Sequence, residues 1–128
     1  MSKFKKLYAY IDIGCMDKIS QSIQLRIIKL FATENNAKII FLTNEDINSI
    51  KTQMVLKSKI KESPKVDGFI FFSINQFCYG NFNIEILKKI LKKKYNLYFS
   101  KEELIFNYKD KYLKKKISEI VIYSHIKK

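Results

Sequence analysis

The sequence predicts an α/β protein, a three-layer sandwich built around a mostly parallel four-stranded sheet. Short apolar runs alternate with longer segments in which apolar residues recur at helical spacing. The runs are apolar throughout, which is typical of parallel strands buried on both faces. Because strands and helices alternate along the chain, right-handed crossovers would give a flavodoxin-like or Rossmann-like arrangement. With 128 residues and no linker or repeat, we interpret residues 1–128 as a single domain.

The predicted strands are four apolar runs that end in polar residues or glycine. They cover residues 6–13, 37–43, 66–74 and about 97–100. The third run contains Phe71 and Phe72, which should point to opposite faces of the sheet and both be buried. Its end then turns polar, with Ser73, Asn75 and Gln76 close together.

The segments between the strands predict helices. Asp17 would cap the first helix, which ends near Asn35. Further helices are expected over about residues 47–61 and over residues 83–95, where lysines form the outer side. The last helix, Asp110–Lys127, carries apolar residues on more than one side. This pattern predicts a homodimer or a partner contact through that helix.

The charge of the chain is strongly positive, but its composition argues against nucleic acid as the partner. The net charge is +13, and Arg26 is the only arginine among 25 basic residues. Proteins that bind phosphates favour arginine, because its guanidinium makes paired hydrogen bonds. We therefore interpret the lysines as a solvated coat on the outer helix faces.

Several chemistries lack the residues they need. Cys15 and Cys78 are not at metal-ligand spacing and His125 is the only histidine, so we expect no metal site and no histidine-based triad. Gly14 does not begin a dinucleotide-binding glycine motif, and no phosphate-binding loop is present, so no cofactor is predicted. No apolar run reaches the ~18–20 residues of a membrane helix, and we expect a cytoplasmic protein.

Polar side chains follow each predicted strand. Since parallel strands end at one edge of a sheet, these residues should share a rim where a ligand can bind. The candidate ligand-binding residues are Asp12, Gly14, Gln21, Gln24, Thr43, Ser73, Asn75 and Gln76. Glu45 and Glu102 are the candidates for general acid and base catalysis.

A purely structural interpretation of the same residues is also open. Gly14 would make a tight turn, and acidic residues such as Glu45 would favour a helix start. Asn75 and Gln76 would satisfy the backbone of their own loop.

The order of strands and helices resembles the catalytic domain of the serine recombinases, or resolvases. The stretch "LYAYID" precedes a glutamine-containing helix, and "VDGFIFF" corresponds to the strand before the active-site loop. That family carries a tyrosine, an arginine and a nucleophilic serine after its first strand. The matching stretch here has Tyr10, Asp12 and Gly14, so the resemblance implies the fold and not the recombination chemistry.

A second resemblance covers roughly residues 7 to 104. Four motifs are similar to those of the sporadic carbohydrate cluster proteins, a bacterial family encoded in surface-polysaccharide gene clusters. The matching stretches are "SQSIQ" (Gln21, Gln24), "LTNED" (Thr43, Glu45), "DGFIFFSINQF" (Asp67, Ser73, Gln76) and "YFSKEEL" (Phe99, Glu102, Leu104). The resemblance implies a role in lipopolysaccharide, O-antigen or capsule biosynthesis.

We therefore expect the rim to bind or modify a sugar or a nucleotide-sugar. Amide side chains both donate and accept hydrogen bonds, which suits ligands rich in hydroxyl groups. Two alternatives stay open: a non-catalytic dimeric scaffold for a carbohydrate enzyme, and a degenerate recombinase-like module that binds DNA.

Overall fold

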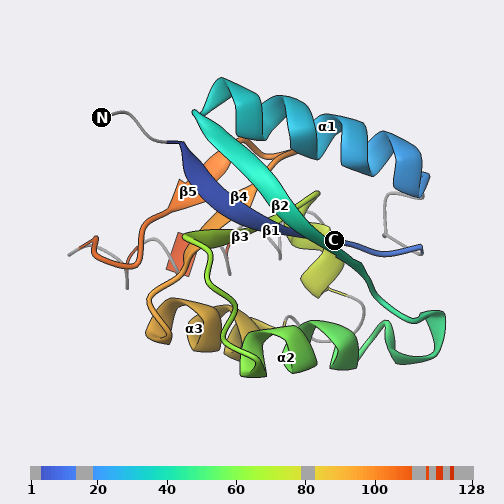
Figure 1. Cartoon of the computed structure of the whole chain (residues 1–128). Helices are drawn as coiled ribbons and strands as arrows, with labels where there is room; N and C mark the ends of the chain where they lie inside the picture. Colours follow the sequence, from blue (N-terminus) through green and yellow to red (C-terminus); the bar gives the residue numbers. More distant parts are fainter. Residues whose placement is uncertain are drawn as a thin grey trace.

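The computed structural model of this chain describes residues 4–13, 19–78 and 83–110, together with residues 115, 118, 119 and 122. Its five strands form one sheet in the order β2-β1-β3-β4-β5 (Figure 1). The strands are β1 (Lys5–Ile11), β2 (Ala37–Asn44), β3 (Gly68–Phe71), β4 (Asn96–Phe99) and β5 (Leu104–Phe106). The first four are parallel, and β5 pairs antiparallel with β4.

The predicted fold class is confirmed, with one strand more than the four expected. β5 has three residues and follows β4 through a turn in which Glu103 has a φ of 57°. A strand this short has no recognisable period in the sequence, and its pairing depends on a backbone reversal that glutamate seldom adopts.

Helices cover both faces of the sheet. α1 (Gln21–Glu34) lies on one face, and α2 (Met54–Lys61) and α3 (Ile84–Lys92) lie on the other (Figure 1). Two 3₁₀ turns, η1 (Ile47–Ser49) and η2 (Ile74–Phe77), follow β2 and β3. This is the three-layer sandwich that the apolar strands predicted.

Two helix starts differ from the sequence prediction. The cap of α1 is Ser20, whose side chain accepts a hydrogen bond from the Ile23 N–H, and the predicted cap Asp17 lies outside the described residues. The expected helix over residues 47–61 is divided into η1 and α2. Gln53, at a φ of 55°, separates them because a left-handed residue interrupts the helical hydrogen bonds.

The last predicted helix falls largely outside the described residues. Lys115, Ser118, Glu119 and Ile122 are helical and exposed. Most of the apolar side chains behind the predicted dimer contact are not described. Among the helices of the described ranges, none is long and apolar enough to cross a membrane.

The core consists of two apolar clusters, one on each face of the sheet. Tyr8, Tyr10, Phe69 and Phe71 pack with α2 and α3, and the alternate residues of β1 and β3 pack with α1. Phe71 is 0% exposed and Phe72 is 2% exposed, in opposite clusters, as the sequence predicted. The central strands are therefore closed to solvent on both faces.

Strands β3 and β4 approach each other closely at Gly68. A Cβ atom at this position would lie 2.5 Å from the backbone oxygen of Asn96. A backbone atom in the middle of a sheet has little freedom to move away, so this contact requires glycine.

We expect Gly68→Ala to lower the free energy of unfolding by about 1–3 kcal/mol, the usual cost of overpacking a core. Urea denaturation at neutral pH measures the change. Lys65→Ala, at an exposed position just before β3, is the control and should be nearly neutral. An unchanged midpoint in Gly68→Ala would contradict the close approach.

Candidate functional site

The polar residues predicted at the carboxyl ends of the strands do gather there, and most are buried. Asp12, Gln24, Ser73 and Gln76 are 0% exposed. Glu45 and Asn75 are also buried, whereas Gln21, Thr43 and Glu102 are half-buried. Gly14 lies outside the described residues. The gathering is greatest between β1 and β3, which are neighbours in the sheet.

This position is the topological switch point of the sheet. From β1 the chain crosses to β2 on one side, whereas β3 and β4 follow on the other side. The helices that make these connections diverge to opposite faces (Figure 1). In open α/β sheets the strand ends at such a point form the crevice where ligands bind.

A chain of hydrogen bonds connects the ends of three strands at this switch point. The Gln76 Nε2 donates to Asp12 Oδ2 at 3.4 Å, and its Oε1 accepts the Ser73 N–H at 3.0 Å. The Ser73 hydroxyl donates to Glu102 Oε2 at 2.7 Å. We call Asp12, Gln76, Ser73 and Glu102 the rim network.

The capping box of η2 holds two members of this network. The Ser73 Oγ accepts the Asn75 N–H at 3.0 Å, while Gln76 returns to the Ser73 backbone. The sequence "SINQ" is the S-x-x-Q pattern of such a box. It explains two of the three polar residues that end this buried strand, Ser73 and Gln76, because the backbone that leaves the sheet needs these partners.

Glu102 reaches the network from the turn between β4 and β5. Besides the Ser73 hydroxyl, its carboxylate accepts the Ile74 N–H at 3.2 Å. Burial raises the pKa of Glu102 above its usual value, although both hydrogen bonds oppose the shift. A carboxyl group of this kind holds its proton closer to neutral pH, as an acid or base catalyst must.

Glu45, the second predicted catalytic residue, accepts hydrogen bonds from other donors. The Tyr10 hydroxyl donates to it at 2.9 Å, the Ser49 hydroxyl donates to its second oxygen, and the Val55 and Leu56 N–H groups donate at 3.1 and 3.2 Å. Glu45 therefore closes the first turn of α2, where the helix dipole favours a negative charge. Its geometry is that of a structural cap.

Tyr10 is held in its protonated form chiefly by burial. Burial, followed by the negative charge of Glu45, raises the pKa of its hydroxyl far above the usual value. A tyrosine in this state donates a hydrogen bond to Glu45 and keeps its proton.

Gln53 belongs to the site but was not predicted from the sequence. Its Nε2 donates to the Gln76 backbone oxygen at 3.0 Å and lies 3.5 Å from the Tyr10 hydroxyl. Its Oε1 accepts from Asn83 Nδ2 at 3.0 Å. The sequence predicts a continuous helix through Gln53. In the structure, the backbone of Gln53 is left-handed, and its side chain lies toward the rim.

Gln24 fixes the backbone at the end of β1. Its Nε2 donates to the Asp12 and Ile19 backbone oxygens, both at 2.8 Å. The predicted glutamine thus lies at the rim, where it bridges the two ends of the β1–α1 connection.

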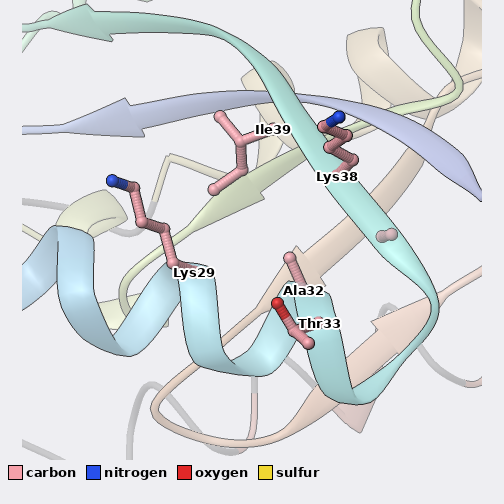
Figure 2. Close-up of a pocket in the computed structure, with 6 residues that line it drawn as sticks. Lys29, Ala32, Thr33, Lys38 and Ile39 are labelled. Carbon is pink, nitrogen blue, oxygen red and sulfur yellow. The ribbon is translucent and has the colours of Figure 1, made fainter.

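Several surface cavities lie away from the rim network. One cavity of about 220 Å³ lies between α1 and β2 (Figure 2). Its lining includes Lys29, Ala32 and Thr33 from α1 and Lys38 and Ile39 from β2. Another, of about 240 Å³, lies at the opposite end of the sheet, where β1, β3 and β4 begin.

A third cavity is a groove of about 470 Å³ between α2 and α3. Its lining consists of Ile60 and four lysines: Lys57, Lys61, Lys89 and Lys93. Lys93 Nζ donates to the Ile60 backbone oxygen at 3.0 Å, so one of these charges stabilises the end of α2. Over the described part of the chain, no cluster of residues is suited to hold a metal ion.

The geometry defines an α/β sandwich of the resolvase type. The structure is similar to a resolvase family site-specific recombinase from Streptococcus pneumoniae, with a TM-score of 0.68 and 18% sequence identity. The match covers 96% of this chain and 87% of the recombinase chain. No family model matches the sequence, and no curated protein matches it. The likeness therefore establishes the fold.

The raised pKa of Glu102 predicts a pH dependence of stability. The folded state binds the Glu102 proton more tightly than the unfolded state, so this residue stabilises the fold below its usual pKa of 4.5. The contribution is lost as the pH rises through the raised value. Glu102→Gln removes the titration but keeps an oxygen to accept from Ser73. The stability of Glu102→Gln relative to the wild type should therefore increase with pH.

Urea denaturation at a series of pH values from about 4 to 7 measures this difference. Glu103→Gln, at the exposed neighbouring position, controls for the loss of one negative charge. A difference between Glu102→Gln and the wild type that stays constant over the series would show that Glu102 titrates normally.

Proposed function

We propose that the chain binds a sugar or nucleotide-sugar at the switch point and takes part in the biosynthesis of bacterial surface carbohydrates such as lipopolysaccharide, O-antigen or capsule. The observation that carries the proposal is the rim network, which gathers an amide, a hydroxyl and two carboxyl groups at the ends of β1, β3 and β4. Sugar-binding sites use this combination because each ligand hydroxyl both donates and accepts.

The geometry of the network favours exchange with a ligand. The bond between Gln76 and Asp12 is 3.4 Å long, at the weak end of the range for hydrogen bonds. A ligand hydroxyl placed between these side chains would accept from Gln76 and donate to Asp12 in place of this weak bond. Glu102 is the half-buried member of the network and is the group that solvent reaches first.

The resemblance to the sporadic carbohydrate cluster proteins supports the same site. Ser73 and Gln76 belong to the motif "DGFIFFSINQF", and Glu102 belongs to the separate motif "YFSKEEL". The 2.7 Å hydrogen bond between Ser73 and Glu102 joins these two motifs in space. If the protein is an enzyme, Glu102 is the residue in this network that would transfer a proton.

Recombination chemistry has less support, although the fold is shared. The stretch that matches the recombinase active site carries Asp12 and lacks the nucleophilic serine and its arginine. Phosphoryl transfer requires concentrated positive charge around the reacting phosphate. Arg26, the single arginine, is exposed in the middle of α1.

We expect Gln76→Ala to abolish or strongly weaken binding of UDP-linked and dTDP-linked hexoses in isothermal titration calorimetry. Under a purely structural role, the substitution would lower stability by about 1 kcal/mol and leave binding intact. Asn35→Ala is the matched control, because it removes an amide that caps the far end of α1. Wild-type binding by both Gln76→Ala and Glu102→Gln would exclude the rim as the site.

A second candidate function, DNA binding, is favoured by the lysine groove between α2 and α3. The basic lining of Lys57, Lys61, Lys89 and Lys93 could follow a phosphate backbone. Lysine without arginine predicts contacts that depend on charge alone, so they should be weak and independent of sequence.

For the wild-type chain, we expect duplex DNA binding to be lost at about 0.15 M salt. Fluorescence anisotropy with two unrelated duplexes of equal length measures both the affinity and the sequence preference. Lys57→Gln combined with Lys89→Gln should reduce any low-salt binding, and Lys5→Gln with Lys6→Gln removes equal charge elsewhere. Sub-micromolar, sequence-dependent binding at physiological salt would make DNA binding the primary function.

A further inference from the structure

Strand β2 forms one edge of the sheet and presents an apolar surface there. Its neighbour on one side is β1, and no described element pairs with its other side (Figure 1). Ile40, Phe41 and Leu42 are consecutive and 40%, 47% and 46% exposed. We call these three residues the β2 edge. Soluble monomers seldom leave a run of this kind open, because its unpaired backbone pairs readily with another strand.

Few of the usual protective features are present. β2 has eight residues, contains no proline and carries a single charge, Lys38. The opposite edge strand, β5, has only three residues and is protected by its shortness. The two edges of the sheet are thus unequal, and only β2 is long enough to extend the sheet.

A bulge in β2 determines which part of the strand is regular. Leu7 pairs with Ile39 and Tyr8 pairs with Phe41, so Ile40 is the extra residue. The register is then continuous from Phe41 to Asn44. A second strand would therefore pair best with a segment centred near Leu42.

The charges near the two ends of β2 favour a second copy of β2 as the strand that pairs with this edge. Lys38 precedes this centre by four residues, and Asp46 follows it by four residues. Lys38 and Asp46 are both exposed in the described structure. When two copies of β2 pair antiparallel about Leu42, the end of β2 that carries Lys38 in each copy lies beside the end that Asp46 follows in the other. Symmetry makes this favourable contact twice, in a chain whose net charge of +13 otherwise opposes self-association.

We propose that the chain forms a homodimer by antiparallel pairing of β2 with β2 of a second copy, which joins the two sheets into one. Leu42 of one copy meets Leu42 of the other at the centre, Phe41 beside it faces Thr43, and the Lys38–Asp46 contacts close both ends. The interface is independent of the rim network, because that network lies at the ends of β1, β3 and β4 and includes no residue of β2. It also differs from the contact expected through the last helix.

Existing contacts of the two charged residues are compatible with this arrangement. Lys38 Nζ lies 5.4 Å from the centre of the exposed Phe4 ring, a weak contact that a facing carboxylate can supplement. One oxygen of Asp46 accepts the Asn48 N–H at 2.9 Å, which fixes the carboxylate at the end of the strand.

Sedimentation equilibrium of the full chain, at concentrations up to about 100 µM, measures the dimer Kd. Leu42→Lys should raise this Kd about tenfold or more, because like charges would face each other at the centre of the pairing. Ile105→Lys places a lysine at an exposed site on β5 and should leave the Kd unchanged. Circular dichroism confirms that each variant is folded.

Charge exchange tests the predicted register. Lys38→Glu alone and Asp46→Lys alone should each weaken the homodimer, because each places two like charges together at both ends. An equimolar mixture of the two variants should recover the wild-type affinity, since both contacts are then between opposite charges. Asp46→Lys also removes the side-chain cap of η1. That cap is still absent from one partner in the mixture, so recovery would show that the charges, and not the cap, set the affinity.

The outcomes separate the alternatives. A wild-type chain that stays monomeric at about 100 µM overturns the proposal. So does a dimer whose Kd is unaffected by Leu42→Lys, which would point to the last helix instead. A dimer weakened by Leu42→Lys but not recovered in the charge-exchanged mixture overturns the register about Leu42.

Discussion

Burial of both faces of β1 and β3 is the constraint on which the rest of this structure depends. The residues of β3 and those of β1 from Leu7 to Ile11 are closed between α1 on one face and α2 and α3 on the other. The side chains in these segments have almost no exposure to water. Functional polar groups can therefore appear only where the strands end, and every group placed there must find a partner.

The exit of β3 meets this requirement with its own residues. Ser73 and Gln76 form a capping box around the first turn after the strand, and their remaining hydrogen-bonding groups point to Glu102 and Asp12. The same residues thus end the strand and furnish the candidate site. This dual use is physically economical, because a polar group already desolvated and oriented loses little entropy when it binds a ligand.

Two carboxylates that look equivalent along the chain have different environments in the fold. Glu45 receives four hydrogen bonds at the start of α2, two of them from the N–H groups of the first helical turn. Glu102 receives two, in a setting where burial raises its pKa. The number of donors around each group, and not its place after a strand, distinguishes a structural cap from a candidate proton carrier.

The sequence by itself determined the sandwich class, the parallel strands, the opposite burial of Phe71 and Phe72, and the end of the sheet where polar residues gather. These features follow from local period and apolar content, which a single segment carries. Only the tertiary structure decided that Ser73 contacts Glu102, that Gln53 turns inward at a left-handed residue, and that β5 reverses beside β4. It also decided that β2 is an edge. Each of these depends on contacts between segments far apart in the chain, and periodicity within one segment holds no information about its neighbours.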